Sequence, residues 1–330
     1  MTSSPSARTP IVAAIAFAAL QAAHAAPVYT LTDLGPDTTA AAINAKGSVV
    51  GVHAGVPSIW KAGTWTPVAG ASGATVTAIN KSGATAGWVA ASTGRPEPAT
   101  WNAKGKQATI GVPAPDTSGY ANGIADDGTV VGYERSFQGV NSVFTYGRGV
   151  RVEMTCGNGA VSCDAWAINA NGQFTGEISN AAGGFDAYVQ TAGTWKDIGT
   201  LGGFNGVGQA LNGAGHVAGA STTAKSGDNF HAFLYDGEKM RDLGTLTGVQ
   251  SWALGIDDSD TVVGYTQDSK RRKDAFVYFG GMMYALSGVV SNADGWHLNV
   301  ATGIDHAGRI VGNGAIGGVP HAFLLDLRSR

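Results

Sequence analysis

The chain has 330 residues with 21 Lys and Arg against 24 Asp and Glu, which gives a formal net charge of −3. Only 14% of residues are charged, whereas 50 are glycine. A nucleic-acid partner would need a basic face, so this composition predicts no nucleic-acid binding. The one basic run, Lys270 to Lys273, is interpreted as a solvated loop, with a docking patch as the alternative.

Residues 1–25 have the pattern of an export signal. A polar start with Arg8 precedes an unbroken apolar run from Ile11 to Leu20, and Ala23-His24-Ala25 offers small residues for cleavage. A buried N-terminal helix is the alternative. The run is too short to span a bilayer and no later stretch matches it, so we predict no integral membrane segment after signal removal. We expect one domain over residues 26–330, secreted or periplasmic.

One phrase recurs seven times along the mature chain. Each copy has a small residue, Ile or Leu, usually Asn or Asp, and ends on a Gly eight positions after the Ile or Leu. The Ile and Leu positions lie 36 to 48 residues apart, which is the length of a small sheet. They are Ile43, Ile79, Ile124, Ile168, Leu211, Ile256 and Ile304.

Each copy reads as four short strands with period-two patterning. The first two strands flank a four-residue turn such as Asn169-Ala170-Asn171-Gly172, in which Asn accepts backbone hydrogen bonds and Gly supplies positive φ. A third strand carries an aromatic core residue, and a tight turn leads to the fourth. The third-strand aromatic residues are Trp60, Trp101, Phe144, Tyr188, Phe233, Phe276 and Phe323.

Seven such sheets bury their faces by stacking radially, so the predicted fold is all-β: a seven-bladed β-propeller of four-stranded antiparallel blades. Ala or Gly precedes each first-strand Ile or Leu, as expected where blades crowd around an axis. The last copy lacks a fourth strand, and the segment Val28 to Gly35 is a spare one, so we expect this N-terminal strand to close the ring. An open solenoid is the alternative.

The repeats resemble the so-called HAF repeats, which are named for a His-Ala-Phe third strand and occur in exported bacterial proteins. The triplet stands at His231-Ala232-Phe233 and at His321-Ala322-Phe323, and Asp-Leu-Gly-Thr-Leu runs from Asp242 to Leu246. The resemblance is sharp from Ala165 onward, while the first three copies are degenerate. It implies a repeat architecture and an extracytoplasmic address, and it implies no chemistry.

The chain has two cysteines, Cys156 and Cys163, close together in a Gly-rich stretch. In an oxidising compartment this spacing predicts a short-loop disulfide rather than two free thiols.

A ligand site is expected where variable loops meet a rigid frame. The turns between first and second strands and between third and fourth strands are uniformly short. The connections between second and third strands and between repeats are longer and vary in composition, which predicts a site on the long-loop rim. Four aromatic residues are the candidate ligand-binding residues, with packing under the loops as the alternative: Tyr120, Trp166, Trp252 and Trp296.

No catalytic motif occurs among HExxH, GxSxG, CxxC or phosphate loops, and we assign no catalytic residue, metal ligand or cofactor. Asp164 and Asp294 are expected near the long-loop rim, but as a pair they identify no reaction. The acidic turn Asp257 to Asp260 suggests a calcium site, or simply a turn in which Asp260 replaces Gly.

The function that fits best is a non-enzymatic, exported binding scaffold for a glycan or protein ligand. The alternative is a secreted propeller enzyme, a hydrolase or lyase acting on polysaccharide. Converging Asp, Glu or His pairs would favour the enzyme, and aromatic and amide side chains without such a pair would favour the scaffold.

Overall fold

The structure is a computed structural model that describes residues 26–225 and 227–329. The predicted export signal, residues 1–25, lies outside the described residues. The described chain consists of β-strands and two short 3-10 turns, so the predicted all-β class is confirmed. No helix in the described part is long and apolar enough to cross a membrane.

The strands follow the sequence repeats, which we number as units 1 to 7 in chain order. Units 1 to 3 contain β2 (Thr38–Ile43), β3 (Val49–His53), β4 (Val56–Lys61), β5 (Thr64–Pro67), β6 (Thr75–Ile79), β7 (Thr85–Ala90), β8 (Pro96–Trp101), β9 (Gln107–Thr109), β10 (Ser118–Ile124), β11 (Val130–Arg135), β12 (Asn141–Gly147) and β13 (Val150–Met154).

Units 4 to 6 contain β14 (Cys163–Ile168), β15 (Phe174–Ser179), β16 (Phe185–Thr191), β17 (Thr194–Gly199), β18 (Gly202–Leu211), β19 (Val217–Thr223), β20 (Phe230–Tyr235), β21 (Met240–Gly244), β22 (Gln250–Ile256), β23 (Val262–Gln267), β24 (Lys273–Phe279) and β25 (Met282–Ala285). Unit 7 contains β26 (Trp296–Ile304), β27 (Ile310–Ile316), β28 (Val319–Ser329) and the N-terminal β1 (Val28–Pro36). The 3-10 turns are η1 (Gly157–Gly159) and η2 (Leu286–Gly288).

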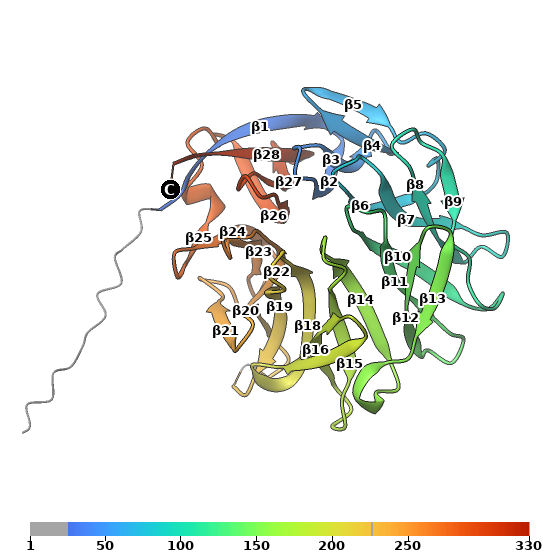
Figure 1. Ribbon diagram of the computed structural model, residues 1–330. Coiled ribbons are helices and arrows are strands. Elements are labelled where there is room, and N and C mark those ends of the chain that lie inside the picture. The colour runs from blue at the N-terminus through green and yellow to red at the C-terminus, as the bar shows by residue number, and fades with distance from the viewer. Residues whose placement is uncertain (1–25, 226, 330) are drawn as a thin grey trace, which may run out of the picture.

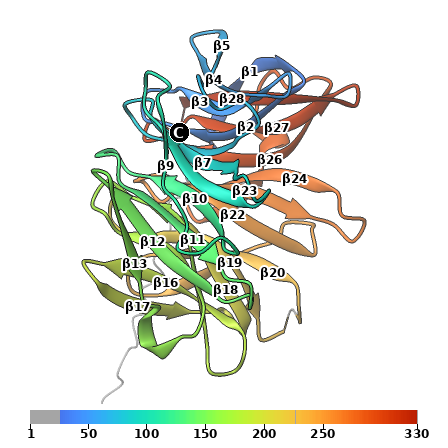
Figure 2. The same cartoon turned by 90° about the vertical axis from the view of Figure 1, so that its right-hand side faces the viewer.

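Each unit pairs its strands in an antiparallel meander, and the sheets are arranged radially about a common axis (Figure 1). The side view shows the same sheets packed face against face (Figure 2). The sheets of units 4 and 5 are joined into one eight-stranded sheet, but only through a single parallel pair, Phe185 with Asn205.

Strand β1 pairs antiparallel with β28, with Leu31 opposite Leu325 and Thr32 opposite Leu324. The pairing places Tyr29 in the core beside Leu286 and Leu325, where it is 1% exposed. Strand β1 therefore supplies the fourth strand of unit 7, from the opposite end of the sequence.

The innermost strand of each unit carries small residues where neighbouring units approach closely. Ala121, Ala165, Ala253 and Ala301 are fully buried. A Cβ added to Gly255 would lie 3.1 Å from the Cα of Gly303 in the next unit. All seven innermost strands also have a β-bulge one residue before the repeat's small residue, for example between Ala121 and Gly123. The predicted crowding near the axis is therefore present.

Third-strand aromatic residues fill the wider space between units. Trp101, Phe144, Tyr188, Phe233, Phe276 and Phe323 are fully buried, as predicted, and Trp60 is half-buried. They pack in apolar clusters that join two neighbouring units, as Phe144 of unit 3 does with Ala86 and Ile110 of unit 2. These clusters bury sheet faces that would be exposed to water in an isolated sheet.

The links between second and third strands are shorter than predicted in units 1 and 7. The link between β3 and β4 is the two-residue turn Ala54-Gly55, and the link between β27 and β28 is Gly317-Gly318. Both residues have positive φ in each case, which suits the right-handed twist of a hairpin. The long-loop rim is therefore long in some units only. Three of the four turn residues are Gly, which takes positive φ at little cost, and Ala54 takes it at φ +48°.

Candidate functional site

The first turn of units 1, 2, 4 and 5 does more than reverse the chain. The Oδ1 atom of Asn44 accepts hydrogen bonds from the backbone N–H groups of Lys46 and Ser48, as predicted. Its Nδ2 donates to the carbonyl of Asn80 in unit 2 at 2.8 Å. The same donation to the next unit is made by Asn80, Asn169 and Asn212. These amides tie neighbouring units together around the axis.

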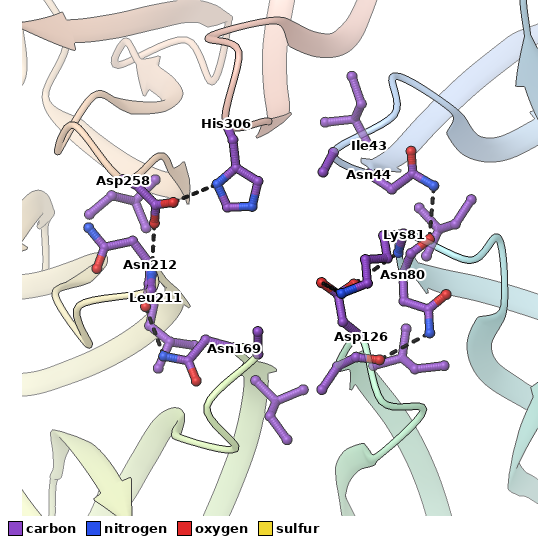
Figure 3. A pocket seen from close by; sticks show the side chains of 18 of the residues that line it. Ile43, Asn44, Asn80, Lys81, Asp126, Asn169, Leu211, Asn212, Asp258 and His306 are labelled. Atoms are coloured by element: carbon purple, nitrogen blue, oxygen red, sulfur yellow. Dashed lines mark hydrogen bonds and ion pairs between the residues drawn. The ribbon is translucent and has the colours of Figure 1, made fainter.

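These turns surround a pocket of about 250 Å³ on the axis (Figure 3). Its apolar part is formed by the repeated Ile and Leu positions, which all seven units contribute. At its mouth Lys81 Nζ lies 3.2 Å from Asp126 Oδ2, and His306 Nδ1 lies 2.7 Å from Asp258 Oδ2. The pocket therefore offers an apolar ring with these two polar contacts at its mouth.

The axial pocket lies at the short-turn end of the sheets, whereas the sequence predicts a site on the long-loop rim. None of the four aromatic candidates lines it. The spacing of the repeat brings the Ile and Leu side chains together here because their strands end at the same height.

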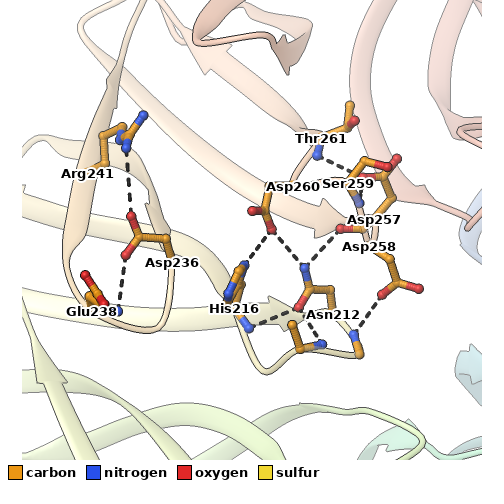
Figure 4. Close-up of polar contacts among 12 residues, drawn as sticks. Asn212, His216, Asp236, Glu238, Arg241, Asp257, Asp258, Ser259, Asp260 and Thr261 are labelled. Atoms are coloured by element: carbon orange, nitrogen blue, oxygen red, sulfur yellow. Dashed lines mark hydrogen bonds and ion pairs between the residues drawn. The ribbon is translucent and has the colours of Figure 1, made fainter.

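The acidic turn of unit 6 binds its neighbours rather than standing free (Figure 4). Asp260 has φ +60°, so it takes the left-handed conformation that Gly has in the other units. Its Oδ1 accepts from Asn212 Nδ2 at 2.9 Å and contacts His216 Nδ1 at 2.8 Å. Asp258 Oδ1 accepts from the N–H of Gly213 at 2.8 Å. The turn interpretation is confirmed for Asp260.

No group of three or more His, Cys, Asp or Glu residues is placed to hold a metal ion within residues 26–225 and 227–329. In the acidic turn, Asp257 Oδ1 accepts from Ser259 and Thr261 of the same turn, whereas the carboxylates of Asp258 and Asp260 contact neighbouring units.

A second constellation lies toward the opposite ends of the innermost strands. Tyr120 on β10 stacks on Tyr133 of β11, with ring centroids 5.0 Å apart. Trp88 of unit 2 meets Tyr120 edge-on at 5.2 Å, and Trp166 of unit 4 lies 5.6 Å from Tyr133. We call these four half-buried side chains, which span units 2 to 4, the aromatic row. The row includes two of the predicted residues, Tyr120 and Trp166.

Two carboxylates adjoin the aromatic row in unit 4. Asp164 on β14 faces Glu177 on β15 in the strand register. Asp164 is 6% exposed, and its Oδ1 accepts a hydrogen bond from Asn141 Nδ2 at 2.6 Å. The buried hydroxyl of Tyr188 on β16 donates to the backbone carbonyl of Asp164 at 2.8 Å, which holds β14 in place. We call Asp164 and Glu177 the carboxylate pair.

Burial dominates the proton affinities here. It raises the pKa of Asp164 to about 6, against a smaller lowering by Asn141 and Arg135. Burial and then the charge of Asp164 raise the pKa of Glu177 to about 7. Burial, followed by Asp164, raises the pKa of Tyr133 to about 12. Two carboxylates at such close range resist simultaneous ionisation, so the pair retains a proton near neutral pH.

The other two predicted aromatic residues lie elsewhere. Trp252 occupies in unit 6 the position that Tyr120 has in unit 3, and packs against Phe230 at 4.7 Å. Trp296 begins β26 and packs edge-on against His321 and Phe323. Asp294 is exposed in the connection before β26. The acidic neighbour of Asp164 is therefore Glu177.

The residues that sequence reasoning missed share one position in the repeat. Trp88, Tyr133, Glu177 and Tyr265 each directly follow the Gly that ends the repeated phrase. In the antiparallel register they face the first-strand residues Thr75, Tyr120, Asp164 and Trp252. These residues could have been found by comparing, in every unit, the first-strand residue with the residue that follows the phrase-ending Gly.

The predicted disulfide between Cys156 and Cys163 is present, with Cα atoms 5.7 Å apart. It closes the loop that carries η1 between units 3 and 4, and Gly157 of that loop packs against Trp195. Cys163 directly precedes Asp164. The disulfide therefore anchors the start of β14 beside the carboxylate pair.

The histidines of the His-Ala-Phe triplets have a structural partner. His231 Nδ1 lies 2.9 Å from Asp242 Oδ2, and His321 Nδ1 lies 2.8 Å from Asp33 Oδ1. Each Asp belongs to the Asp-Leu-Gly ending of the paired fourth strand. These imidazoles thus link the third and fourth strands of units 5 and 7, whereas the aromatic row lies in units 2 to 4.

No protein-family model and no curated protein matches this chain. Solved structures match it at low identity. Acylaminoacyl peptidase from Pyrococcus horikoshii is 11% identical with a TM-score of 0.53, over 91% of this chain and 52% of that chain. A prolyl endopeptidase structure is 12% identical with a TM-score of 0.54, over 87% and 44%.

The β-propeller domain of the Trilobed protease from Pyrococcus furiosus is 12% identical, with a TM-score of 0.48 over 74% of this chain and 79% of that chain. This chain spans about half the length of the two peptidase chains. At such identities the likeness is one of fold, and the fold is a β-propeller.

Proposed function

We propose that this protein is an exported, non-enzymatic β-propeller scaffold that binds a glycan or protein ligand through the aromatic row. The observation that carries the proposal is the contact chain from Trp88 through Tyr120 and Tyr133 to Trp166. These residues come from three units, and all are half-buried. Tyr and Trp offer large, rigid faces with a polar end, which suits them to binding surfaces.

The scaffold we propose has seven blades and a closed ring. Support comes from the four strands of each repeat unit and from the single residue pair that joins units 4 and 5. Contacts also cross from unit 7 to unit 1: Asn313 Oδ1 accepts from the N–H of Ala40 at 2.7 Å, and Asn313 Nδ2 donates back to the Ala40 carbonyl at 3.0 Å. In a closed ring the sheet edges that remain are the short outer strands of the units.

An exported location, secreted or periplasmic, fits the disulfide, because such bonds persist in oxidising compartments. The same address is implied by the resemblance to the HAF repeats.

The binding proposal is tested with a glycan array and with capture of extracellular proteins by the immobilised mature chain. Every hit is repeated with Tyr120→Ala and with the matched variant Trp296→Ala, which removes an aromatic residue outside the row. Loss of binding in the first variant alone is expected. Equal binding by both variants places the ligand elsewhere and overturns the assignment of the row.

The carboxylate pair supports a second candidate, a polysaccharide hydrolase or lyase. Glycoside hydrolysis uses two carboxyl groups, one of them held protonated by its surroundings, and the pKa of Glu177 is raised to about 7 by burial and by Asp164. The test is turnover of any bound glycan by the native chain and by Asp164→Asn and Glu177→Gln. Binding without turnover excludes this candidate, and turnover abolished by either variant replaces the scaffold proposal.

A further inference from the structure

We propose that the aromatic row and the carboxylate pair together bind a lysine side chain of a protein partner, with the ammonium group over Tyr133 and beside Asp164. The inference rests on the proposed binding function and specifies the chemistry of its ligand.

The chain itself provides an example of this contact in unit 6. Tyr265 stands at the same repeat position as Tyr133, directly after the Gly that ends the repeated phrase. The Nζ atom of Lys273 lies 4.0 Å from the centroid of the Tyr265 ring. An ammonium group over an aromatic face is attracted by the negative face of the ring. This position of the repeat thus accepts a lysine head group.

Unit 3 lacks that lysine. Lys273 pairs with Gln267 in the strand register, and the equivalent pair in unit 3 is Asn141 with Arg135. The shorter Asn141 side chain turns instead to Asp164. Among the described residues, the cation–ring contacts involve Phe144, Tyr235 and Tyr265, and none involves the aromatic row.

The neighbouring unit makes the unit 3 position better suited to a cation than its counterpart. Beside Lys273, unit 7 contributes His297, Asn299, Val300 and Asn313 to a shared pocket of about 450 Å³. Val300 and Asn313 face each other in the register. At the corresponding positions beside Tyr133, unit 4 contributes Asp164 and Glu177. Two neutral residues are therefore replaced by two carboxylates where the ammonium group would lie.

No cation of the described chain neutralises the carboxylate pair by direct contact. Arg135, on the same strand as Tyr133, is exposed and forms no ion pair with either carboxylate among the described residues. Its charge lowers the pKa of Asp164 less than burial raises it. A buried carboxylate is stabilised in its charged form by a cation within about 4–6 Å, and an incoming ammonium group supplies one.

Binding should therefore release a proton. The groups that face the pair are Tyr133 and Arg135 from β11, Asn141 from β12 and Tyr188 from β16, with Tyr120 behind Tyr133. Tyr133 and Tyr188 keep their protons at neutral pH, because the ordinary pKa of a tyrosine is 10.0 and burial raises it further in both. The titration that controls lysine binding is thus that of Asp164 and Glu177, and binding strengthens as pH rises.

The test is a titration of the ¹⁵N-labelled mature chain with the peptide acetyl-Gly-Lys-Gly-amide, followed by the eight tryptophan indole N–H resonances. Trp166→Phe and Trp88→Phe assign the two resonances of the row. The matched probe carries Nε-acetyl-lysine, which has the same length and no charge. Glucosamine oligomers and their N-acetylated forms test a sugar in place of the peptide.

We expect the lysine peptide to shift the Trp166 resonance, with affinity about tenfold higher at pH 8 than at pH 5.5, and the acetylated peptide to bind at least tenfold more weakly. The double variant Asp164→Asn, Glu177→Gln should remove the pH dependence. Arg135→Gln, which removes a competing cation and leaves the pair intact, should bind as tightly as the native chain or more so.

The inference is overturned if the acetylated peptide binds equally well, if affinity does not depend on pH, or if glucosamine oligomers alone move the Trp166 resonance. In the last case the binding function of the row survives and the lysine assignment does not. A ligand that moves neither Trp166 nor Trp88 overturns both. Because the pH comparison uses the native chain, the outcome does not depend on the folding of the double variant.

Discussion

Asp164 lies directly opposite Glu177 in the antiparallel ladder of β14 and β15. The equivalent ladder positions are Tyr120 with Tyr133 in unit 3 and Trp252 with Tyr265 in unit 6. One architectural position of the repeat thus carries aromatic pairs in two units and an acidic pair in a third. The repeat holds the backbone constant, so the chemistry of the position depends on the side chains alone.

The carboxylate pair should make the protein less stable as pH rises. The folded pKa values of about 6 for Asp164 and about 7 for Glu177 exceed the ordinary values of 3.8 and 4.5. The native state therefore holds protons that the unfolded state has lost, and the stabilisation present below pH 4 disappears as pH rises through 6 to 7. Urea unfolding at pH 4.5 to 8.5 measures the slope.

Asp164→Asn keeps the acceptor for Asn141 and removes the charge, so it should flatten this slope and stabilise the protein at pH 8 by on the order of 1 kcal/mol. The exposed Asp294→Asn serves as control and should leave the slope unchanged. The raised pKa values of the carboxylate pair would be contradicted if the stability of the native chain rose with pH between pH 5 and 7.5 and still did so in Glu177→Gln.

Crowding at the axis predicts different outcomes for two glycines at the same repeat position. A Cβ on Gly255 would lie 3.1 Å from Gly303 Cα and 3.1 Å from Val263 Cγ2, whereas a Cβ on Gly303 would meet Ile43 Cγ2 at an ordinary 3.6 Å. Gly255→Ala should cost about 1–3 kcal/mol of unfolding free energy. Gly303→Ala should cost less than half of that. If both variants lose the same unfolding free energy in chemical denaturation, the units at Gly255 are not packed more tightly than those at Gly303.

The amide links between units predict that Asn44→Asp destabilises the fold. The carboxylate can still accept from Lys46 and Ser48, but it cannot donate to the buried carbonyl of Asn80. The expected cost is about 1–3 kcal/mol. In unit 7 the native residue is already Asp305, and Arg309 pairs with it and reaches the Ala45 carbonyl at 3.4 Å.

A comparison of Asn44→Asp with Asn44→Ala separates the two roles of the amide. The Ala variant loses both the acceptor and the donor and should be the less stable of the two. If Asn44→Asp matches the native chain in thermal unfolding at pH 7, the link to unit 2 adds nothing to stability.

The contribution of the N-terminal strand can be measured at two adjacent residues of β1. Tyr29 is 1% exposed, whereas Val28 is 39% exposed. Tyr29→Ala should cost about 3–5 kcal/mol because it opens a cavity in the core between β1, β28 and η2. Val28→Ala should change stability by less than about 0.5 kcal/mol. Similar small effects of both variants would mean that β1 is not integral to the sheet of unit 7.

Much of the architecture could be predicted because it is written into the repeat. Turn Asn and Gly, Ala before the first-strand Ile, and the third-strand aromatic residues recur at fixed offsets, and each has a local physical reason. Even the exception at Asp260 was predictable, since Asp tolerates positive φ. The axial pocket was missed because its Ile and Leu side chains meet only when all the units are placed around one axis.

The candidate site was predictable in part. Tyr120 and Trp166 stand out on the first strand, but Tyr133 and Glu177 lie thirteen residues beyond Tyr120 and Asp164 and become their neighbours only through antiparallel register. Sequence spacing does not give the register across a turn that contains a β-bulge in one strand, because the bulge shifts the pairing by one residue.

The sequence by itself determined the all-β class, the strand and turn order of each unit, and the cysteine pair, because these depend on residue periodicity and on backbone preferences within about ten residues. The tertiary structure decided which side chains of neighbouring units meet. Tyr133 therefore lies near Asp164, whereas Tyr265 lies under Lys273. The physical reason is that charge and burial depend on distance through space. Packing around the axis, rather than any local preference, sets that distance.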